Sequence, residues 1–310
     1  MFNPLSVLKK GDKVIIVAPA GKVNQDDLEY GIQILKSWGL VVELGDYVQG
    51  DDPYFAAPDQ KRLSDFQNAL NNDNYKAIFC ARGGYGSVRI IEQIDWQPFI
   101  KKPKWIIGYS DITLLLNKIQ SFNIPCIHGP MPASFSKYKS NDCLDNLYKL
   151  LFEGHYTIQL PMENTIFFNQ NISQLNAQIT GGNLTLIQSS IGTNYSIETN
   201  NRILFLEDVD EYPYKIDRML YQLYHSGYLT NIRGIILGNF KLLQQEREFS
   251  NTITETINSF SIKNLEFIIN NFPAGHDDFN YPIVFGNKIR IIKENKHLHI
   301  NISLYDNDLS

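Results

Sequence analysis

The sequence predicts an α/β protein whose first half is built on a parallel sheet. Within the first 130 or so residues, short apolar runs alternate with stretches whose apolar residues recur at the helical period. Strands that alternate with helices need crossover connections, and crossovers join parallel strands. The length of 310 residues is more than one typical core holds, so we expect two domains.

The expected elements follow one another without long gaps. The apolar run at residues 13–18 is typical of a buried strand, and Pro19 stops it. Asn24 can cap the helix that follows, and Gly39 can close it. Further elements are expected in this order: a strand at 41–44, a helix at 62–70, a strand at 77–81, a helix at 87–94, a strand at 105–107 and a helix at 112–122. Ligands of parallel sheets bind beyond the carboxyl ends of the strands, which directs attention to two loops, those after residues 81 and 107.

The first of these loops is rich in glycine and reads Arg82-Gly83-Gly84-Tyr85-Gly86. Three glycines in four residues allow positive φ and a close approach of the backbone. Where such a loop leads into a helix, its amide hydrogens can face an anion. The alternative is a plain tight turn. The spacing is not Gly-x-Gly-x-x-Gly, so the loop does not predict a dinucleotide site.

The second loop contains a serine at the point where a buried strand turns into a helix. It reads Gly108-Tyr109-Ser110-Asp111, and Ser110 takes the position of the serine in a nucleophile elbow. The spacing Gly-x-Ser-x-Gly of the common elbow motif is absent. The alternative is that Ser110 is a helix N-cap, a position that serine often fills.

Carboxylates cluster after a strand in the second half. The apolar run at residues 202–206 leads directly into residues 207–211, four of which are acidic. Like charges at this density repel one another and favour a partner. The alternative is a solvated acidic turn that caps a helix at 214–225. His276 is the one of six histidines that lies between a glycine and acidic residues in a short loop.

The stretch between the two halves reads as a connection. Residues 135–168 are polar and irregular, apart from a helix-like segment near 143–152. The second domain then opens at two glycines followed by Asn183, which can cap the next helix. A further strand is expected at residues 234–238.

Composition excludes several classes of protein. The net charge is −5, and the basic residues are scattered, so we expect no binding to nucleic acid. We see neither a signal peptide nor an apolar run near the roughly 18 residues of a membrane span. The three cysteines, Cys80, Cys126 and Cys143, are odd in number and widely spaced, which suits a reducing compartment. We therefore expect a cytoplasmic protein without a membrane partner.

Taken together, several segments resemble the LD-carboxypeptidase family of serine peptidases. Each segment alone is weak evidence of the resemblance, but the segments occur in the family's order and span nearly the whole chain. The resembling segments are Ala81-Arg82-Gly83-Gly84-Tyr85-Gly86, Gly108-Tyr109-Ser110-Asp111, His128-Gly129-Pro130-Met131, Gly181-Gly182-Asn183-Leu184, Leu206-Glu207-Asp208-Val209-Asp210-Glu211 and Ala274-Gly275-His276.

The resemblance implies a fold and an activity. It implies a flavodoxin-like N-terminal domain with a parallel sheet at residues 1–134, a connection at 135–168 and a mixed α/β C-terminal domain at 169–310. The implied activity, part of peptidoglycan recycling, is cleavage of the amide bond between the L-centre of a diamino acid and a terminal D-alanine in murein tetrapeptides. The family also implies a homodimer, of which the sequence itself gives no sign.

Site residues follow from the same resemblance. Ser110 is expected to be the nucleophile, His276 the general base and Glu207 the carboxylate that orients the histidine. The oxyanion hole would use the amides of Asp111 and Gly84. Since the nucleophile lies in the first domain and the acid and base in the second, we expect the site in the cleft between them.

Residues that bind the substrate are also expected beside this site. They are Arg82, Gly83, Tyr85 and Asn183. An arginine suits the carboxylates of a murein peptide, because its planar fork binds both oxygens. Arg89 is a second candidate, unless it lies on the outer helix face and pairs with Glu92. We expect no large aromatic surface for a nucleobase.

Three other interpretations were weighed against the serine peptidase. An amidase of the microcin-immunity type belongs to the same family, but its members tend to carry an added loop that is not obvious here. A non-catalytic binding protein leaves the three triad residues without a joint role. A metal-dependent hydrolase lacks the paired spacing of common zinc motifs, and the serine interpretation needs no metal and no cofactor. The candidate ligands of the metal in such a hydrolase would be Asp208, Asp210, His276, Asp277 and Asp278.

Overall fold

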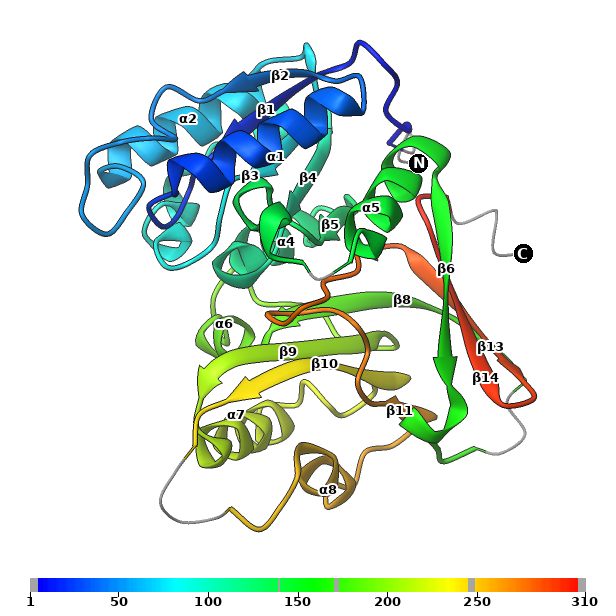
Figure 1. Cartoon of the computed structure of the whole chain (residues 1–310). Coiled ribbons are helices and arrows are strands. Elements are labelled where there is room, and N and C mark those ends of the chain that lie inside the picture. The colour runs from blue at the N-terminus through cyan, green and yellow to red at the C-terminus, as the bar shows by residue number, and fades with distance from the viewer. Residues whose placement is uncertain (1–4, 139, 170–172, 245–248, 306–310) are drawn as a thin grey trace.

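The computed structural model of the chain contains two sheets, and Figure 1 shows the first sheet above the second. It describes residues 5–138, 140–169, 173–244 and 249–305. The first sheet has six strands in the order β12-β5-β4-β3-β1-β2, and all pair in parallel except β12. The order 2-1-3-4-5 of its first five strands is that of flavodoxin-like folds, so the expected α/β class with a flavodoxin-like sheet is confirmed. The strands are β1 (Lys13–Val17), β2 (Val41–Leu44), β3 (Tyr75–Cys80), β4 (Trp105–Gly108), β5 (Cys126–His128) and β12 (Ile283–Phe285).

Helices cross between these strands close to where the sequence predicts them. In α1 the side chain of Asn24 accepts a hydrogen bond from the Asp27 amide, so the predicted cap is confirmed. Gly39 follows this helix with a φ of +89°, which glycine adopts without strain. The helices of this half are α1 (Gln25–Ser37), α2 (Asp59–Asn71), α3 (Gln97–Lys101), α4 (Thr113–Gln120) and α5 (Asp142–Glu153).

The predicted helix at residues 87–94 is wrong. The chain forms two short 3₁₀ turns there, η1 (Ser87–Arg89) and η2 (Ile91–Gln93). The start of this segment is tied to the neighbouring loop, because the Ser87 amide donates to the Asp111 carboxylate at 2.8 Å and the Ser87 hydroxyl donates to the Asp111 carbonyl at 2.7 Å. These tertiary bonds, which local propensity does not reveal, override the helical pattern.

The second sheet has eight strands in the order β6-β14-β13-β8-β9-β10-β11-β7. Strands β8 to β11 pair in parallel, and the strands at both edges are antiparallel, which confirms a mixed α/β second half. Its strands are β6 (His155–Pro161), β7 (Thr165–Phe167), β8 (Gln174–Asn183), β9 (Ile203–Glu211), β10 (Gly234–Leu242), β11 (Phe267–Ile269), β13 (Lys288–Glu294) and β14 (His297–Ser303). Its helices are α6 (Leu184–Ser189), α7 (Pro213–His225) and α8 (Ile253–Asn258).

Two segments differ from the expected pattern. The stretch 135–168 contains the helix expected near 143–152, which is α5, but the rest was expected to be irregular and instead forms β6 and β7, which pair within the second sheet. Residues of β6 alternate between buried and exposed, so a period of two marks this strand inside a polar segment. The acidic residues 207–211 belong to β9 itself and are not a turn. The domain boundaries themselves remain a prediction.

Apolar packing holds the two sheets in one structure. One core cluster runs from β1 and β3 through Phe205 and Phe285 to β14, and β12 carries a segment of the second half into the first sheet. The three cysteines are buried and unpaired. Among the described residues, no helix combines the length and apolarity that crossing a membrane requires.

Candidate functional site

The loop after β4 holds Ser110 in a conformation that non-glycine residues seldom adopt. The backbone φ of Ser110 is +63°, a left-handed value that the surrounding structure must support. Gly108, two residues earlier, makes the sharp turn possible, because a Cβ there would lie 2.8 Å from Ile112 Cγ2. Ser110 is half-buried and stands where the strand gives way to η3 (Ser110–Ile112) and α4. The turn has the features of a nucleophile elbow without the usual spacing of glycines.

Three residues from distant parts of the chain form one line of hydrogen bonds. His276 Nε2 lies 2.9 Å from Ser110 Oγ, and His276 Nδ1 lies 2.7 Å from Glu207 Oε2. Ser110 follows β4 in the first sheet, Glu207 lies within β9 of the second, and His276 lies in the loop between β11 and β12. The three residues therefore meet between the sheets, as a nucleophile, a base and an orienting carboxylate are arranged in serine hydrolases.

Glycine also shapes the loop that carries the histidine. Gly275 has φ +129°, and its amide donates to Asn280 Oδ1 at 3.1 Å. A Cβ at Gly275 would lie 3.1 Å from both Glu207 Cβ and Glu207 Oε2. The loop thus approaches the carboxylate as closely as a residue without a side chain allows.

Burial and charge set the protonation of this line. The Glu207 side chain is fully buried, and its Oε1 has no hydrogen-bond partner among the described residues. Burial lowers the pKa of His276, but the neighbouring Glu207 carboxylate outweighs it through charge and hydrogen bonding, so the pKa is raised above its ordinary value. For Asp208, burial and the Glu207 charge raise the pKa to about 6. The carboxylate of Glu207 thereby favours a protonated imidazole, which is the species formed when a serine gives up its proton.

The glycine-rich loop lies directly against the serine. A Cβ at Gly83 would lie 2.7 Å from Ser110 Cβ and 3.3 Å from the Asp111 amide nitrogen. Gly84 has φ +102° and lies beside Gly21. The Asp111 carboxylate accepts from the Ser87 amide, so this side chain holds the loop in place. The loop therefore brings backbone amides close to the serine, and Gly83 is the residue in contact with it.

Comparison with known proteins supports what the geometry indicates. A model of the LD-carboxypeptidase N-terminal domain matches residues 14–129, and a model of the LD-carboxypeptidase C-terminal domain matches residues 176–291. The chain belongs to the LD-carboxypeptidase family. Both models fall on the segments that supply the hydrogen-bonded line, since Ser110 lies in the first match and Glu207 and His276 lie in the second.

Individual relatives cover nearly the whole length of this LD-carboxypeptidase. A protein of Bacillus subtilis named probable murein peptide carboxypeptidase is 33% identical, over 91% of this chain and 89% of its own. The murein tetrapeptide carboxypeptidase of Pseudomonas aeruginosa is 28% identical, over 92% and 94%. The crystal structure of muramoyltetrapeptide carboxypeptidase from Oxalobacter formigenes covers 94% of this chain and 98% of its own, with 25% identity and a TM-score of 0.81. Microcin self-immunity proteins such as MccF share the fold at 22% identity and a TM-score of 0.83.

The predicted substrate-binding residues of this LD-carboxypeptidase differ in their surroundings. Arg82 is exposed, donates to the Lys22 carbonyl at 2.7 Å and lines a pocket of roughly 810 Å³ together with Tyr85. The Asn183 side chain is buried and engaged at both ends, because it caps α6 and donates to Asp208. Its predicted helix cap is confirmed. Since both ends of its amide are occupied, Asn183 has less scope than Arg82 to bind a ligand.

The alternative in which Arg89 pairs with Glu92 is wrong. Its guanidinium binds both carboxylate oxygens of Asp59, at 3.0 and 2.9 Å from Nε, while Glu92 accepts from Asn194. The expected 87–94 helix, on which that pairing depended, does not form. Arg89 is therefore occupied by a partner that is distant in sequence.

Two of the acidic residues considered as metal ligands, Asp208 and Asp277, have other surroundings in the structure. Asp208 accepts from Asn183 and Thr185, and Asp277 lines a separate pocket with Asn239. Among the described parts of the chain, no three histidine, cysteine or acidic side chains lie together as a metal site requires.

Two residues of the resembling segments, Tyr109 and His128, lie near the site without a predicted role in it. The Tyr109 ring packs on His276 with ring centroids 4.9 Å apart, and on His128 at 5.9 Å. His128 is fully buried, neither ring nitrogen has a partner among the described residues, and burial lowers its pKa to about 4. A neutral His128 and an aromatic Tyr109 thus form an apolar backing for the His276 imidazole. Their signal in the sequence is their place in two resembling segments, one beside Ser110 and the other before Gly129.

The raised pKa of His276 predicts a specific pH dependence. His276 must be neutral to accept the serine proton, so kcat/KM should fall as the pH is lowered through the pKa of this residue. Because Glu207 raises that pKa above 6.5, the loss should begin at a higher pH than an unperturbed histidine would give. A pH profile of kcat/KM measures this directly. A rate that stays flat from about pH 5 to 8 would argue against His276 as the base.

The contact between Gly83 and Ser110 predicts that Gly83→Ala damages activity. The added methyl group would overlap Ser110 Cβ at 2.7 Å and must displace the Ser110 side chain. We expect kcat to fall by about 100-fold or more, since displacements of about 1 Å cost that much. Gly45→Ala is the control, because its Cβ would meet Asp65 Oδ2 at 2.5 Å, away from the serine. Equal activity of the two variants would show that Gly83 does not hold the serine in position.

Proposed function

We propose that this LD-carboxypeptidase is a serine hydrolase that releases the terminal D-alanine from murein tetrapeptides, with Ser110 as nucleophile, His276 as general base and Glu207 as orienting carboxylate. The observation that carries the proposal is the hydrogen-bonded line from Ser110 Oγ through His276 to the buried Glu207. The names of the relatives from Bacillus subtilis and Pseudomonas aeruginosa support the substrate.

The geometry gives each residue one task. Ser110 Oγ attacks the carbonyl carbon of the scissile amide while its proton passes to His276 Nε2. The Glu207 carboxylate, bonded to Nδ1, fixes the tautomer that leaves Nε2 free to accept the proton and stabilises the imidazolium that forms. His276 then returns the proton to the nitrogen of the leaving alanine. A water molecule, activated by the same imidazole, hydrolyses the ester on Ser110 and restores the enzyme.

Backbone amides of two loops stabilise the charge that develops on the carbonyl oxygen. We assign the oxyanion hole to the Asp111 amide, which follows the nucleophile, and to the Gly84 amide of the glycine-rich loop. The contact of Gly83 with Ser110 and its closeness to the Asp111 nitrogen support this placement of the loop. Loss of one donor of this kind typically costs about 100- to 1000-fold in rate.

Substrate carboxylates supply the specificity in this proposal. Arg82 is exposed on the glycine-rich loop and lines the adjoining pocket, so it is our candidate for binding a carboxylate of the murein peptide, with Gly83, Tyr85 and Asn183 around it. We also propose that the protein is cytoplasmic, on the basis of its cysteine usage. Family resemblance is the basis for proposing a role in peptidoglycan recycling and a homodimeric state.

The proposal is tested by comparing three substrates. We expect the murein tetrapeptide to be cleaved with a higher kcat/KM than its C-terminal amide, by about 10- to 150-fold, because loss of a charge-assisted contact leaves its donor unpaired. Equal turnover of acid and amide would show that the terminal carboxylate is not recognised. Faster cleavage of an aminoacyl sulfamoyl adenosine would favour the microcin-immunity activity instead.

A further inference from the structure

A pocket of roughly 810 Å³ opens at the switch point of the first sheet. In the order β2-β1-β3-β4, the chain leaves β1 toward β2 on one side and leaves β3 toward β4 on the other, so the strand order reverses between β1 and β3. Open α/β sheets bind their ligands in the crevice at such a point. Here the crevice is lined by Gly21 and Lys22 after β1 and by Arg82, Gly84 and Tyr85 after β3.

This pocket adjoins the proposed active site through the glycine-rich loop. Gly83 contacts Ser110 on one side, and its carbonyl accepts the Gly21 amide at 3.0 Å on the other. The third wall of the pocket is the segment from Gln49 to Tyr54, which joins the first wall because the Lys22 amide donates to the Tyr54 carbonyl at 3.0 Å. Gly83 therefore lies between Ser110 and a residue that lines the pocket.

Two tyrosine rings stand exposed at this pocket. Tyr54 is 62% exposed and Tyr85 is 43% exposed, with ring centroids 6.5 Å apart. The Phe55 ring lies behind both, at 5.2 Å from Tyr54 and 5.9 Å from Tyr85. We define these two exposed rings as the tyrosine surface. The sequence predicts Tyr85 as a substrate-binding residue, whereas Tyr54 is singled out by the structure alone.

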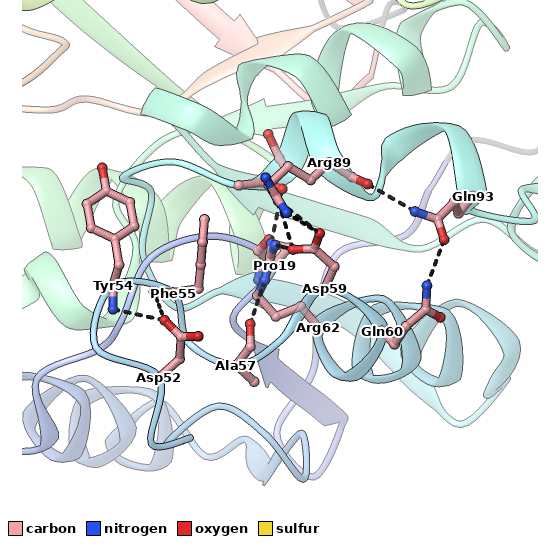
Figure 2. Close-up of polar contacts among 12 residues, drawn as sticks. Pro19, Asp52, Tyr54, Phe55, Ala57, Asp59, Gln60, Arg62, Arg89 and Gln93 are labelled. Atoms are coloured by element: carbon pink, nitrogen blue, oxygen red, sulfur yellow. Dashed lines mark hydrogen bonds and ion pairs between the residues drawn. The ribbon is translucent and has the colours of Figure 1, made fainter.

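The loop that carries Tyr54 is held firmly in place (Figure 2). One Asp52 oxygen accepts from the Tyr54 amide at 2.9 Å and from the Phe55 amide at 2.8 Å. The Phe55 ring lies 4.8 Å from the Arg62 guanidinium and 5.4 Å from that of Arg89.

Arg62 itself joins the three loops around the pocket. It is 1% exposed and donates to the carbonyls of Pro19, Ala57 and Gly86, which follow β1, β2 and β3. A preformed surface of this kind loses little entropy when it binds a ligand, which is the usual basis of an effective binding site.

The direction of the reaction indicates which part of the substrate reaches this pocket. His276 must return its proton to the leaving nitrogen, so the leaving alanine lies on the side of His276 and the second sheet. The acyl portion, which is the rest of the peptide, then extends the other way, over the glycine-rich loop and the loops of the first sheet. The pocket is much larger than one amino acid needs, so it has room for what the peptide carries at its far end.

We infer that the pocket is a saccharide subsite, in which the tyrosine surface packs against the ring of the sugar that murein peptides carry at their amino end. This inference rests on the proposed function. The C–H groups of a pyranose are positively polarised and favour the negative face of an aromatic ring. The other lining groups include the side chains of Gln25, Gln49 and Asp51, which suit hydroxyl and acetamido groups as donors and acceptors.

The test compares a free tetrapeptide with the same tetrapeptide linked to N-acetylmuramic acid. The readout is the ratio of the two kcat/KM values. We expect the wild-type protein to favour the sugar-bearing substrate by about tenfold, the size of effect that an aromatic contact gives. In Tyr54→Ala the ratio should fall to about one, and in Tyr54→Phe, which keeps the ring, it should stay near the wild-type value. Tyr30→Ala is the matched control, because Tyr30 is 45% exposed on α1 and does not line the pocket.

Each other outcome overturns the inference. A wild-type ratio of about one, or a ratio that Tyr54→Ala leaves unchanged, would show that the tyrosine surface does not bind the sugar. If Tyr54→Ala impairs cleavage of an aminoacyl sulfamoyl adenosine and not the sugar preference, the surface holds a nucleobase. Should no murein substrate be cleaved, the proposed function fails by itself. The subsite is then tested separately by calorimetric binding of N-acetylmuramoyl tetrapeptide to Ser110→Ala and to Ser110→Ala with Tyr54→Ala, where equal affinity contradicts it.

Discussion

Replacing Ser110 by alanine is expected to abolish turnover and leave the fold intact. In the described structure the Ser110 hydroxyl lies 2.9 Å from His276 Nε2 and is its hydrogen-bond partner, so without it the imidazole has no nucleophile to activate. Loss of a serine nucleophile costs about 10⁶-fold in kcat in serine proteases, so we expect at least a 10⁴-fold loss here. Alanine and serine meet the same strain at φ +63°, so the free energy of unfolding should change by no more than about 1 kcal/mol.

The measurement is kcat of the purified variant, with its thermal unfolding as a check of the fold. Ser87→Ala is a useful control, because the Ser87 hydroxyl donates to the Asp111 carbonyl in the same region without facing His276. A Ser110→Ala protein that is folded and keeps more than a few per cent of wild-type activity would rule out Ser110 as the nucleophile.

Replacing Glu207 by glutamine should give the second largest loss. The glutamine keeps the shape of the side chain but no longer fixes the tautomer of His276, and the corresponding change in a serine protease lowers kcat by about 10⁴-fold. The pKa of His276 should also fall, because the charge that raises it is removed. The acid limb of the kcat/KM profile should therefore move to lower pH, even though the maximal rate falls.

A control for this variant lies in the same strand. Glu211 is in β9 and pairs with Lys215 at 3.0 Å near the surface, so Glu211→Gln changes a charge without touching the imidazole. We expect it to keep wild-type kcat. If Glu207→Gln retains activity within tenfold of wild type and its acid limb does not move, then Glu207 does not orient the histidine.

The sequence predicts those parts of the fold that follow from local pattern. The strands at 13–18 and 105–107 and the Asn24 and Asn183 caps depend on apolar runs and on hydrogen bonds to the next turn of the chain, so the sequence alone reveals them. The 87–94 segment depends instead on Asp111, which binds Ser87 from 24 residues away. Local propensity does not reflect that contact, so the helical pattern of residues 87–94 predicts a helix that does not form.

The site divides along the same line. Ser110, Glu207 and His276 could be named together because of the family resemblance, and their geometry then follows from the meeting of two sheets. The tyrosine surface could be foreseen only in part. Tyr85 lies in the glycine-rich loop and was predicted to bind the substrate, but Tyr54 lies 31 positions earlier in a loop without a motif. The two rings come together because tertiary hydrogen bonds, those of Arg62 among them, join the loops after β1, β2 and β3.

The most direct test of the account is the mass of the covalent intermediate. The protein is mixed with a murein tetrapeptide, quenched in acid over a series of short times and digested, and the peptide that contains Ser110 is examined by mass spectrometry. We predict an ester on Ser110 whose added mass is that of the tripeptide acyl group, with alanine released at the same time. Release of alanine with no adduct at any time, and undiminished in Ser110→Ala, would contradict the account.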